Sequence, residues 1–115
     1  ETQQDKIFED VLQVMLDNKA EDLVYLNVSK FNPLAEYFII CTVQSNRQAL
    51  ALAKHVDDTL AKHEVYIKHI EGNSNSEWIL VDGIDYIVHI FVKDARNRYG
   101  LEKLWSEIPI YKVGD

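Results

Sequence analysis

The chain has little of several residue types, and each shortage argues against a class of protein. It has one cysteine, Cys41, which cannot form an internal disulfide or, unaided, a zinc site. Four glycines leave little material for a phosphate-cradling loop, and no GxGxxG, GxSxG, CxxC or P-loop motif occurs. The longest uninterrupted apolar run, residues 37–41, is far shorter than the roughly 20 residues of a membrane helix. The sequence therefore argues against a disulfide scaffold, a phosphate-loop enzyme and a helical membrane protein.

Positive charge is also scarce. Twelve basic residues stand against 19 acidic ones, so the net charge is −7, and residues 1–25 carry most of that excess. An acidic chain is poorly suited to bind nucleic-acid phosphates, where affinity depends on Lys and Arg. It suits a basic partner, such as a basic protein, because complementary charge speeds encounter. Plain solubility explains the same charge and remains the alternative.

The length and the periodicity of apolar residues predict one folded domain over residues 1–115. Helices are expected over about 3–18, 46–62 and 94–105. Capping patterns at Thr2 and Ser45 begin the first two helices, and Asn32-Pro33 marks a turn. Strands are expected over 23–28, 37–43, 65–70, 78–81 and 86–92.

The order of these elements predicts the fold class. The strand–helix–strand stretch from 37 to 70 requires a parallel crossover, whereas the two strands around residues 82–85 form an antiparallel hairpin. We therefore expect an α/β (α+β) fold with a mixed five-stranded sheet and flanking helices. Gly83 is placed to supply the positive φ of a two-residue turn.

The two faces of the predicted hairpin differ in chemistry, because strand side chains alternate in direction. One face is almost purely apolar and reads as core: Ile79, Val81, Tyr86, Val88, Ile90 and Val92. The other mixes aromatic, acidic and imidazole groups: Trp78, Leu80, Asp82, Asp85, Ile87, His89 and Phe91. Trp is enriched at the centres of interfaces, so the mixed face is a candidate binding surface. The alternative is that a helix covers it.

Catalytic and metal sites find little support in the residues. Asp82 and Asp85 could approach each other across the turn, but no third ligand has a matching spacing. His55 and His63 are eight residues apart and lack the i, i+4 spacing of a helical metal site. We predict a binding module with no catalytic residue, no metal and no cofactor.

A small basic cluster near the C-terminus has two interpretations. It consists of Lys93, Arg96, Arg98 and Lys103, beside Tyr99 and Trp105. Such a cluster could touch RNA. Because acids are interspersed with these cations, a solvated, salt-bridged helix is the preferred interpretation.

Several segments together resemble the Iojap-like family of ribosomal silencing factors, in the family's order and spacing over about residues 7–106. The matching segments are Lys19-Ala20-Glu21-Asp22, Ala35-Glu36-Tyr37-Phe38-Ile39-Ile40-Cys41, Ser45-Asn46-Arg47-Gln48 with Ala53 and Val56, Glu71-Gly72, Trp78-Ile79-Leu80-Val81-Asp82, Asp85 with Val88-His89-Ile90-Phe91, and Arg96 with Tyr99-Gly100-Leu101-Glu102-Lys103-Leu104-Trp105. Gly83-Ile84 replaces the family's usual Tyr-Gly pair, so the aromatic contact at the hairpin tip is either lost or supplied by Tyr86.

The resemblance implies a nucleotidyltransferase-like topology without the catalytic signature. It also implies binding to ribosomal protein L-fourteen on the large ribosomal subunit, a steric block to joining of the small subunit, and repression of translation. A homodimer is expected when the protein is off the ribosome. The expected location is the bacterial cytoplasm, or an organelle if a targeting segment has been removed.

Carried onto this chain, the resemblance and the hairpin faces select six partner-binding residues: Trp78, Leu80, Asp82, Asp85, Tyr86 and His89. Two alternatives remain. One is a biogenesis factor that uses the same site on the large subunit. The other is a metal-dependent nucleotide-binding enzyme that uses Asp82 and Asp85.

Overall fold

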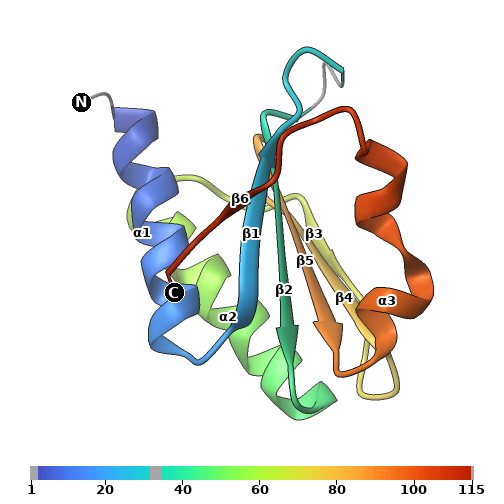
Figure 1. Ribbon diagram of the computed structural model, residues 1–115. Coiled ribbons are helices and arrows are strands. Elements are labelled where there is room, and N and C mark those ends of the chain that lie inside the picture. Colours follow the sequence, from blue (N-terminus) through green and yellow to red (C-terminus); the bar gives the residue numbers. More distant parts are fainter. Residues whose placement is uncertain (1–2, 32–34, 115) are drawn as a thin grey trace.

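The fold is a six-stranded mixed sheet with helices on both faces (Figure 1), seen in a computed structural model that describes residues 3–31 and 35–114. The elements are α1 (Gln3–Asp17), β1 (Glu21–Asn27), β2 (Tyr37–Val43), α2 (Asn46–Lys62), β3 (His69–Glu71), β4 (Trp78–Asp82), β5 (Tyr86–Val92), α3 (Ala95–Tyr99), the 3-10 helix η1 (Leu101–Trp105) and β6 (Tyr111–Lys112). The strand order is β3-β4-β5-β2-β1-β6. The predicted α/β class with a mixed sheet is confirmed.

The centre of the sheet is the parallel pair of β2 and β5. Their register is continuous from Tyr37 opposite Tyr86 to Val43 opposite Val92, and the other strand pairs are antiparallel. Five of the seven β2 residues are buried, because the strand has neighbours on both sides and helices above and below. This explains why residues 37–43 are almost uninterruptedly apolar.

Three elements differ from the sequence-based expectation. The sheet has a sixth strand, β6, whose two residues are too few to show a period of alternation. The third strand, predicted over 65–70, is shorter and begins later, at His69–Glu71. The helix expected over 94–105 divides into α3 and η1 at Gly100, which adopts the left-handed conformation with φ 62°.

Helix α2 begins as its sequence chemistry suggests. Ser45 caps α2, and its side chain accepts a hydrogen bond from the Gln48 backbone N–H. The apolar side of α2 is buried: Ala49, Leu52, Ala53, Val56 and Leu60. Helix α1 ends before Lys19, which has φ 66°. The predicted cap at Thr2 and the turn at Asn32-Pro33 lie outside the described residues.

Two apolar clusters form on opposite faces of the sheet. The larger fills the α1/α2 face and joins both helices to the inward residues of β2, β4 and β5. The smaller fills the α3/η1 face, where Phe38, Ile40 and Phe91 pack with Ala95 and Ile108. Trp78, Ile87, Leu101 and Trp105 border this second cluster and are only partly buried. The sheet is therefore closed on one face and half open on the other.

Candidate functional site

The hairpin of β4 and β5 carries most of the predicted site. Its register pairs Trp78 with Phe91 and Asp82 with Ile87, and this parity confirms the two predicted faces. The turn residues are Ile84 and Asp85, because the Gly83 N–H donates to the Tyr86 carbonyl at 2.9 Å. The Asp82 side chain supports this turn by accepting the Ile84 N–H at 3.1 Å.

The prediction that Gly83 supplies the positive φ of this turn is wrong. The left-handed residue is Ile84, with φ 73°. Gly83 is required for close packing instead, because a Cβ there would lie 2.9 Å from Leu60 Cδ1 and 3.0 Å from the Tyr86 carbonyl oxygen. The glycine therefore lets the end of the hairpin approach α2.

The mixed face of the hairpin has a covered end and an open end. At the covered end, Trp78 packs against Phe91 and Tyr99, with ring centroids 5.0 Å apart in each case. At the open end, Leu80, Asp82 and Ile87 are half-buried, and Asp85 is exposed on the turn. We call the surface formed by Trp78, Leu80, Asp82, Asp85 and Ile87 the hairpin surface. It combines apolar groups with two carboxylates.

His89 lies beneath this surface and is not part of it. Its side chain is only 4% exposed and packs edge-on against Phe38, at 5.2 Å between centroids. Its Nδ1 accepts a 3.1 Å hydrogen bond from the Trp78 indole Nε1–H. Burial lowers the pKa of His89 to about 4, so the ring is neutral at pH 7. Its Nε2 has no hydrogen-bond partner among the described residues.

Tyr86 lies on the opposite face from the other five predicted residues. It is 2% exposed and stacks with Tyr37 and Phe8 beside α1, with centroid distances of 6.2 Å to each. A ring buried in the α1/α2 face cannot supply an aromatic contact at the hairpin tip. The structure thus brings Trp78, Leu80 and Asp82 to one face, with Asp85 exposed on the adjoining turn, and leaves Tyr86 in the core.

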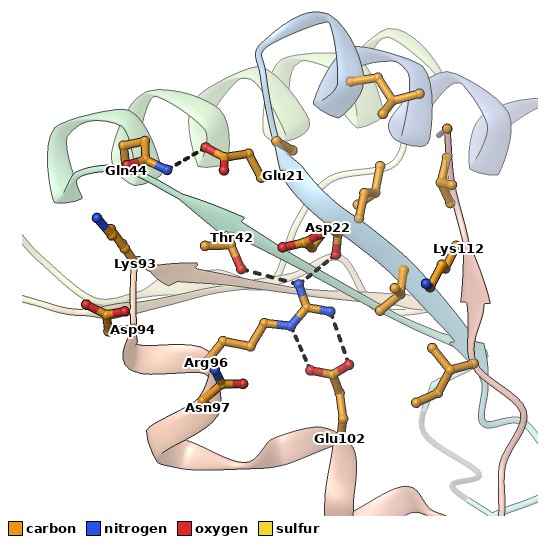
Figure 2. A pocket seen from close by; sticks show the side chains of 17 residues that line it. Glu21, Asp22, Thr42, Gln44, Lys93, Asp94, Arg96, Asn97, Glu102 and Lys112 are labelled. Atoms are coloured by element: carbon orange, nitrogen blue, oxygen red, sulfur yellow. Dashed lines mark hydrogen bonds and ion pairs between the residues drawn. The ribbon is translucent and has the colours of Figure 1, made fainter.

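Two residues of the basic cluster, Arg96 and Arg98, form salt bridges, in line with the interpretation preferred from the sequence. Arg96 donates to both carboxylate oxygens of Glu102, from Nε at 2.7 Å and from a terminal nitrogen at 3.1 Å. Its other terminal nitrogen donates to the Asp22 carbonyl at 2.6 Å and to the Thr42 hydroxyl at 3.3 Å (Figure 2). Arg98 pairs with Glu77 at 2.7 Å.

Arg96 and the residues that it contacts line a cavity of about 1110 Å³ beside β1 and α3. Figure 2 shows the guanidinium at its middle, between Glu102 of η1 and the ends of β1 and β2. Arg96 therefore fastens the α3–η1 segment to the sheet. This is the segment that places Tyr99 against Trp78.

Sequence reasoning did not identify Tyr99 or Phe38 as neighbours of the site. The position of Phe38 beside the site follows from the parallel pairing of β2 with β5, which sets Phe38 opposite Ile87 on the same face. The position of Tyr99 does not follow from strand pairing, because it depends on how α3 docks after the chain leaves β5.

Metal-ligand clusters and membrane-spanning helices are both absent from the described part of the chain. Within residues 3–31 and 35–114, no three His, Cys, Asp or Glu residues gather as metal ligands. His63 contacts Asp10, at 2.7 Å between Nε2 and Oδ2. None of the described helices is long and apolar enough to cross a membrane.

Comparison with known proteins places the chain in a family. Residues 1–114 match the family described as "Ribosomal silencing factor during starvation". The chain belongs to the ribosomal silencing factor family. It is 38% identical over 94 residues to the ribosomal silencing factor RsfS of Bacillus subtilis, a match that covers 82% of this chain and 80% of that protein.

Solved structures agree with this family assignment. A crystal structure of a Chromobacterium violaceum protein superposes with a TM-score of 0.83 at 35% identity, covering 96% of this chain and 92% of that one. More distant relatives of the silencing factor occur in organelles. The mouse protein named "Mitochondrial assembly of ribosomal large subunit protein 1" is 27% identical over 100 residues, which cover 43% of its length. The names of the matched relatives are regulatory or assembly names and indicate no catalytic activity.

Proposed function

We propose that this chain binds the large ribosomal subunit through ribosomal protein L-fourteen and blocks joining of the small subunit. Membership of the silencing factor family supports a ribosomal partner. Translation would fall because the bound domain occupies space that the small subunit needs. The action is steric and not enzymatic, so it requires no cofactor and no metal.

The hairpin surface is the proposed docking site. The observation that carries this proposal is the half-open sheet face, where Trp78, Leu80 and Ile87 remain part-exposed beside Asp82 and Asp85. An apolar centre with a polar rim is typical of protein interfaces. The two carboxylates suit a basic protein surface, in keeping with the net charge of −7. Direct contact with nucleic acid would be slight.

Oligomeric state and location belong to the same proposal. A homodimer forms when the chain is off the ribosome, and ribosome binding takes place in the bacterial cytoplasm. The bacterial relatives support the location, and the organellar relatives support an equivalent role in organelles.

Charge reversal on the hairpin surface tests the site. Asp85→Lys should weaken binding to purified bacterial large subunits at least tenfold in a sedimentation assay, because a carboxylate facing basic groups becomes a cation. Asp58→Lys is the matched control, since Asp58 is an exposed acid on α2 and on the other face. It should bind within about twofold of the wild type. Equal binding by both variants would contradict the site.

Truncation of Trp78 is the stronger test. Trp78→Ala should release the protein from large subunits, because the largest apolar group of the surface is lost. Far-ultraviolet circular dichroism checks that the variant is folded. A folded Trp78→Ala protein that sediments undiminished with large subunits rules out the hairpin surface.

A role in large-subunit assembly is the second candidate. The name of the mouse relative supports it, and it uses the same docking site. Depletion of the protein distinguishes the two roles. Accumulation of incomplete large subunits would favour assembly, whereas normal subunits with excess joining under starvation would favour silencing.

A further inference from the structure

The Trp78 indole has one side-chain hydrogen bond among the described residues, from its Nε1–H to His89 Nδ1. Phe91 and Tyr99 pack against its ring at tilted interplanar angles of 31° and 55°, and such contacts do not select which edge of the indole faces inward. The bond from Nε1 to His89 Nδ1 selects the edge, because a donor requires an acceptor along its axis. The opposite edge of the indole is then the one turned away from His89.

His89 is an acceptor because it is buried. A protonated imidazole has donors on both nitrogens and could not accept the indole N–H. Desolvation lowers the pKa of His89 to about 4, so the neutral form prevails at pH 7. Since Nδ1 accepts from Trp78, the proton of the neutral ring is on Nε2.

Apart from the hydrogen bond that it accepts from Trp78, the burial of His89 is unfavourable. It is the one buried polar side chain among those described, and its Nε2–H has no partner there. Burying a polar group without its hydrogen bonds costs free energy, which an apolar residue at this position would avoid. At 4% exposure the ring offers almost no surface to a partner protein. Its observed polar contact is the one with Trp78.

We infer that His89 is a positioning residue, which holds the Trp78 indole in the orientation that the ribosomal partner recognises. This inference rests on the proposed function, because it takes the hairpin surface as the docking surface. It differs from the sequence-based expectation, in which His89 itself touches the partner. A group that acts by preorganising Trp78 raises affinity by reducing the cost of ordering that side chain on binding.

Two substitutions of His89 separate positioning from simple packing. In His89→Asn, the amide oxygen can occupy the place of Nδ1 and accept the indole N–H. In His89→Leu, the site is filled by an apolar group of similar size and the acceptor is gone. Binding to purified large subunits should weaken about tenfold in His89→Leu and stay within about threefold of the wild type in His89→Asn.

The indole N–H signals give a spectroscopic readout. The chain has two tryptophans, so it gives two indole N–H cross-peaks in a nitrogen–proton correlation spectrum, and Trp78→Phe identifies that of Trp78. His89→Asn should keep this cross-peak near its wild-type position and slow in exchange. His89→Leu should move it upfield and hasten its exchange with solvent.

The outcomes separate two claims: that the hairpin surface is the docking site, and that His89 positions Trp78 within it. If Trp78→Ala binds as the wild type does, the hairpin surface itself is wrong. If Trp78→Ala loses binding but His89→Leu keeps it, the surface stands and the positioning role fails. Equal loss in His89→Leu and His89→Asn also overturns positioning, since rescue by an acceptor is then absent. Should His89→Leu not fold, Trp78→Phe removes the same bond from the donor side, and undiminished binding by it would overturn the inference.

Discussion

The two faces of the sheet are covered very differently. On the α1/α2 face, helices of 15 and 17 residues bury the inward side chains of the central strands. On the α3/η1 face, a five-residue helix and a five-residue 3-10 helix cover only part of the sheet. The closed face is apolar, whereas the half-open face holds the buried His89 and the part-exposed Trp78. We therefore expect stability to reside mainly on the first face and recognition on the second.

Truncating one leucine on each face is the strongest test of this division. Leu60→Ala on the closed face should reduce the free energy of unfolding by about 3–4 kcal/mol, because Leu60 is fully buried and leaves a cavity. Leu80→Ala on the hairpin surface should cost less than about 1 kcal/mol, because the side chain is half-exposed. Urea unfolding measures both. Similar costs for the two variants would contradict the division.

Acid should destabilise the half-open face through His89. Its pKa is lowered from 6.5 to about 4 in the folded protein. Between these values the unfolded chain binds a proton that the folded protein does not, so stability falls as the pH falls from 6.5 to 4. The loss is at most about 3 kcal/mol.

His89→Asn provides the control, because asparagine does not titrate. Urea unfolding at pH 7, 5.5 and 4.5 should show the wild type losing more stability than the variant. Parallel pH dependences would mean that His89 is protonated in the folded protein as readily as in the unfolded chain.

Loosening the α3–η1 segment should have a smaller, local effect. Arg96→Ala removes the two-pronged contact with Glu102 and the bonds to β1 and β2, at a cost of about 2 kcal/mol. Backbone amide exchange should accelerate in α3 and η1 more than in α1 and α2. Arg96→Lys keeps the charge but not the forked geometry, so it should recover only part of the loss. Uniform acceleration over the whole chain would show that Arg96 does not act locally.

Local patterns predicted much of the fold and the two faces of the hairpin on which the candidate site rests. Residues 37–43 form the expected strand because seven apolar or β-branched residues admit few alternatives, and Ser45 caps α2 as its spacing to Gln48 indicates. The two faces of the hairpin were also predictable, because any two-residue turn between β4 and β5 places the same side chains on the same face. The choice of turn was not, because Ile84 adopts a left-handed conformation that glycine would ordinarily take.

The features that eluded prediction depend on contacts between distant segments. Strand β6 exists because residues 111–112 pair with β1, about 86 positions earlier in the chain. His89 packs against Phe38 of β2, and Phe38 in turn packs against Trp105 of η1, so the surroundings of His89 combine three segments that are distant in sequence. Parity assigned His89 to the correct face but could not show whether another element covers it.

The parallel pairing of β2 with β5 has a consequence for synthesis of the chain. Each β2 residue pairs with a partner 49 positions later, so this ladder has a high contact order and forms late. Until residues 86–92 have been made, β2 can pair only with β1 and presents an apolar edge. A nascent or truncated chain that ends before Tyr86 is therefore prone to aggregate through that edge.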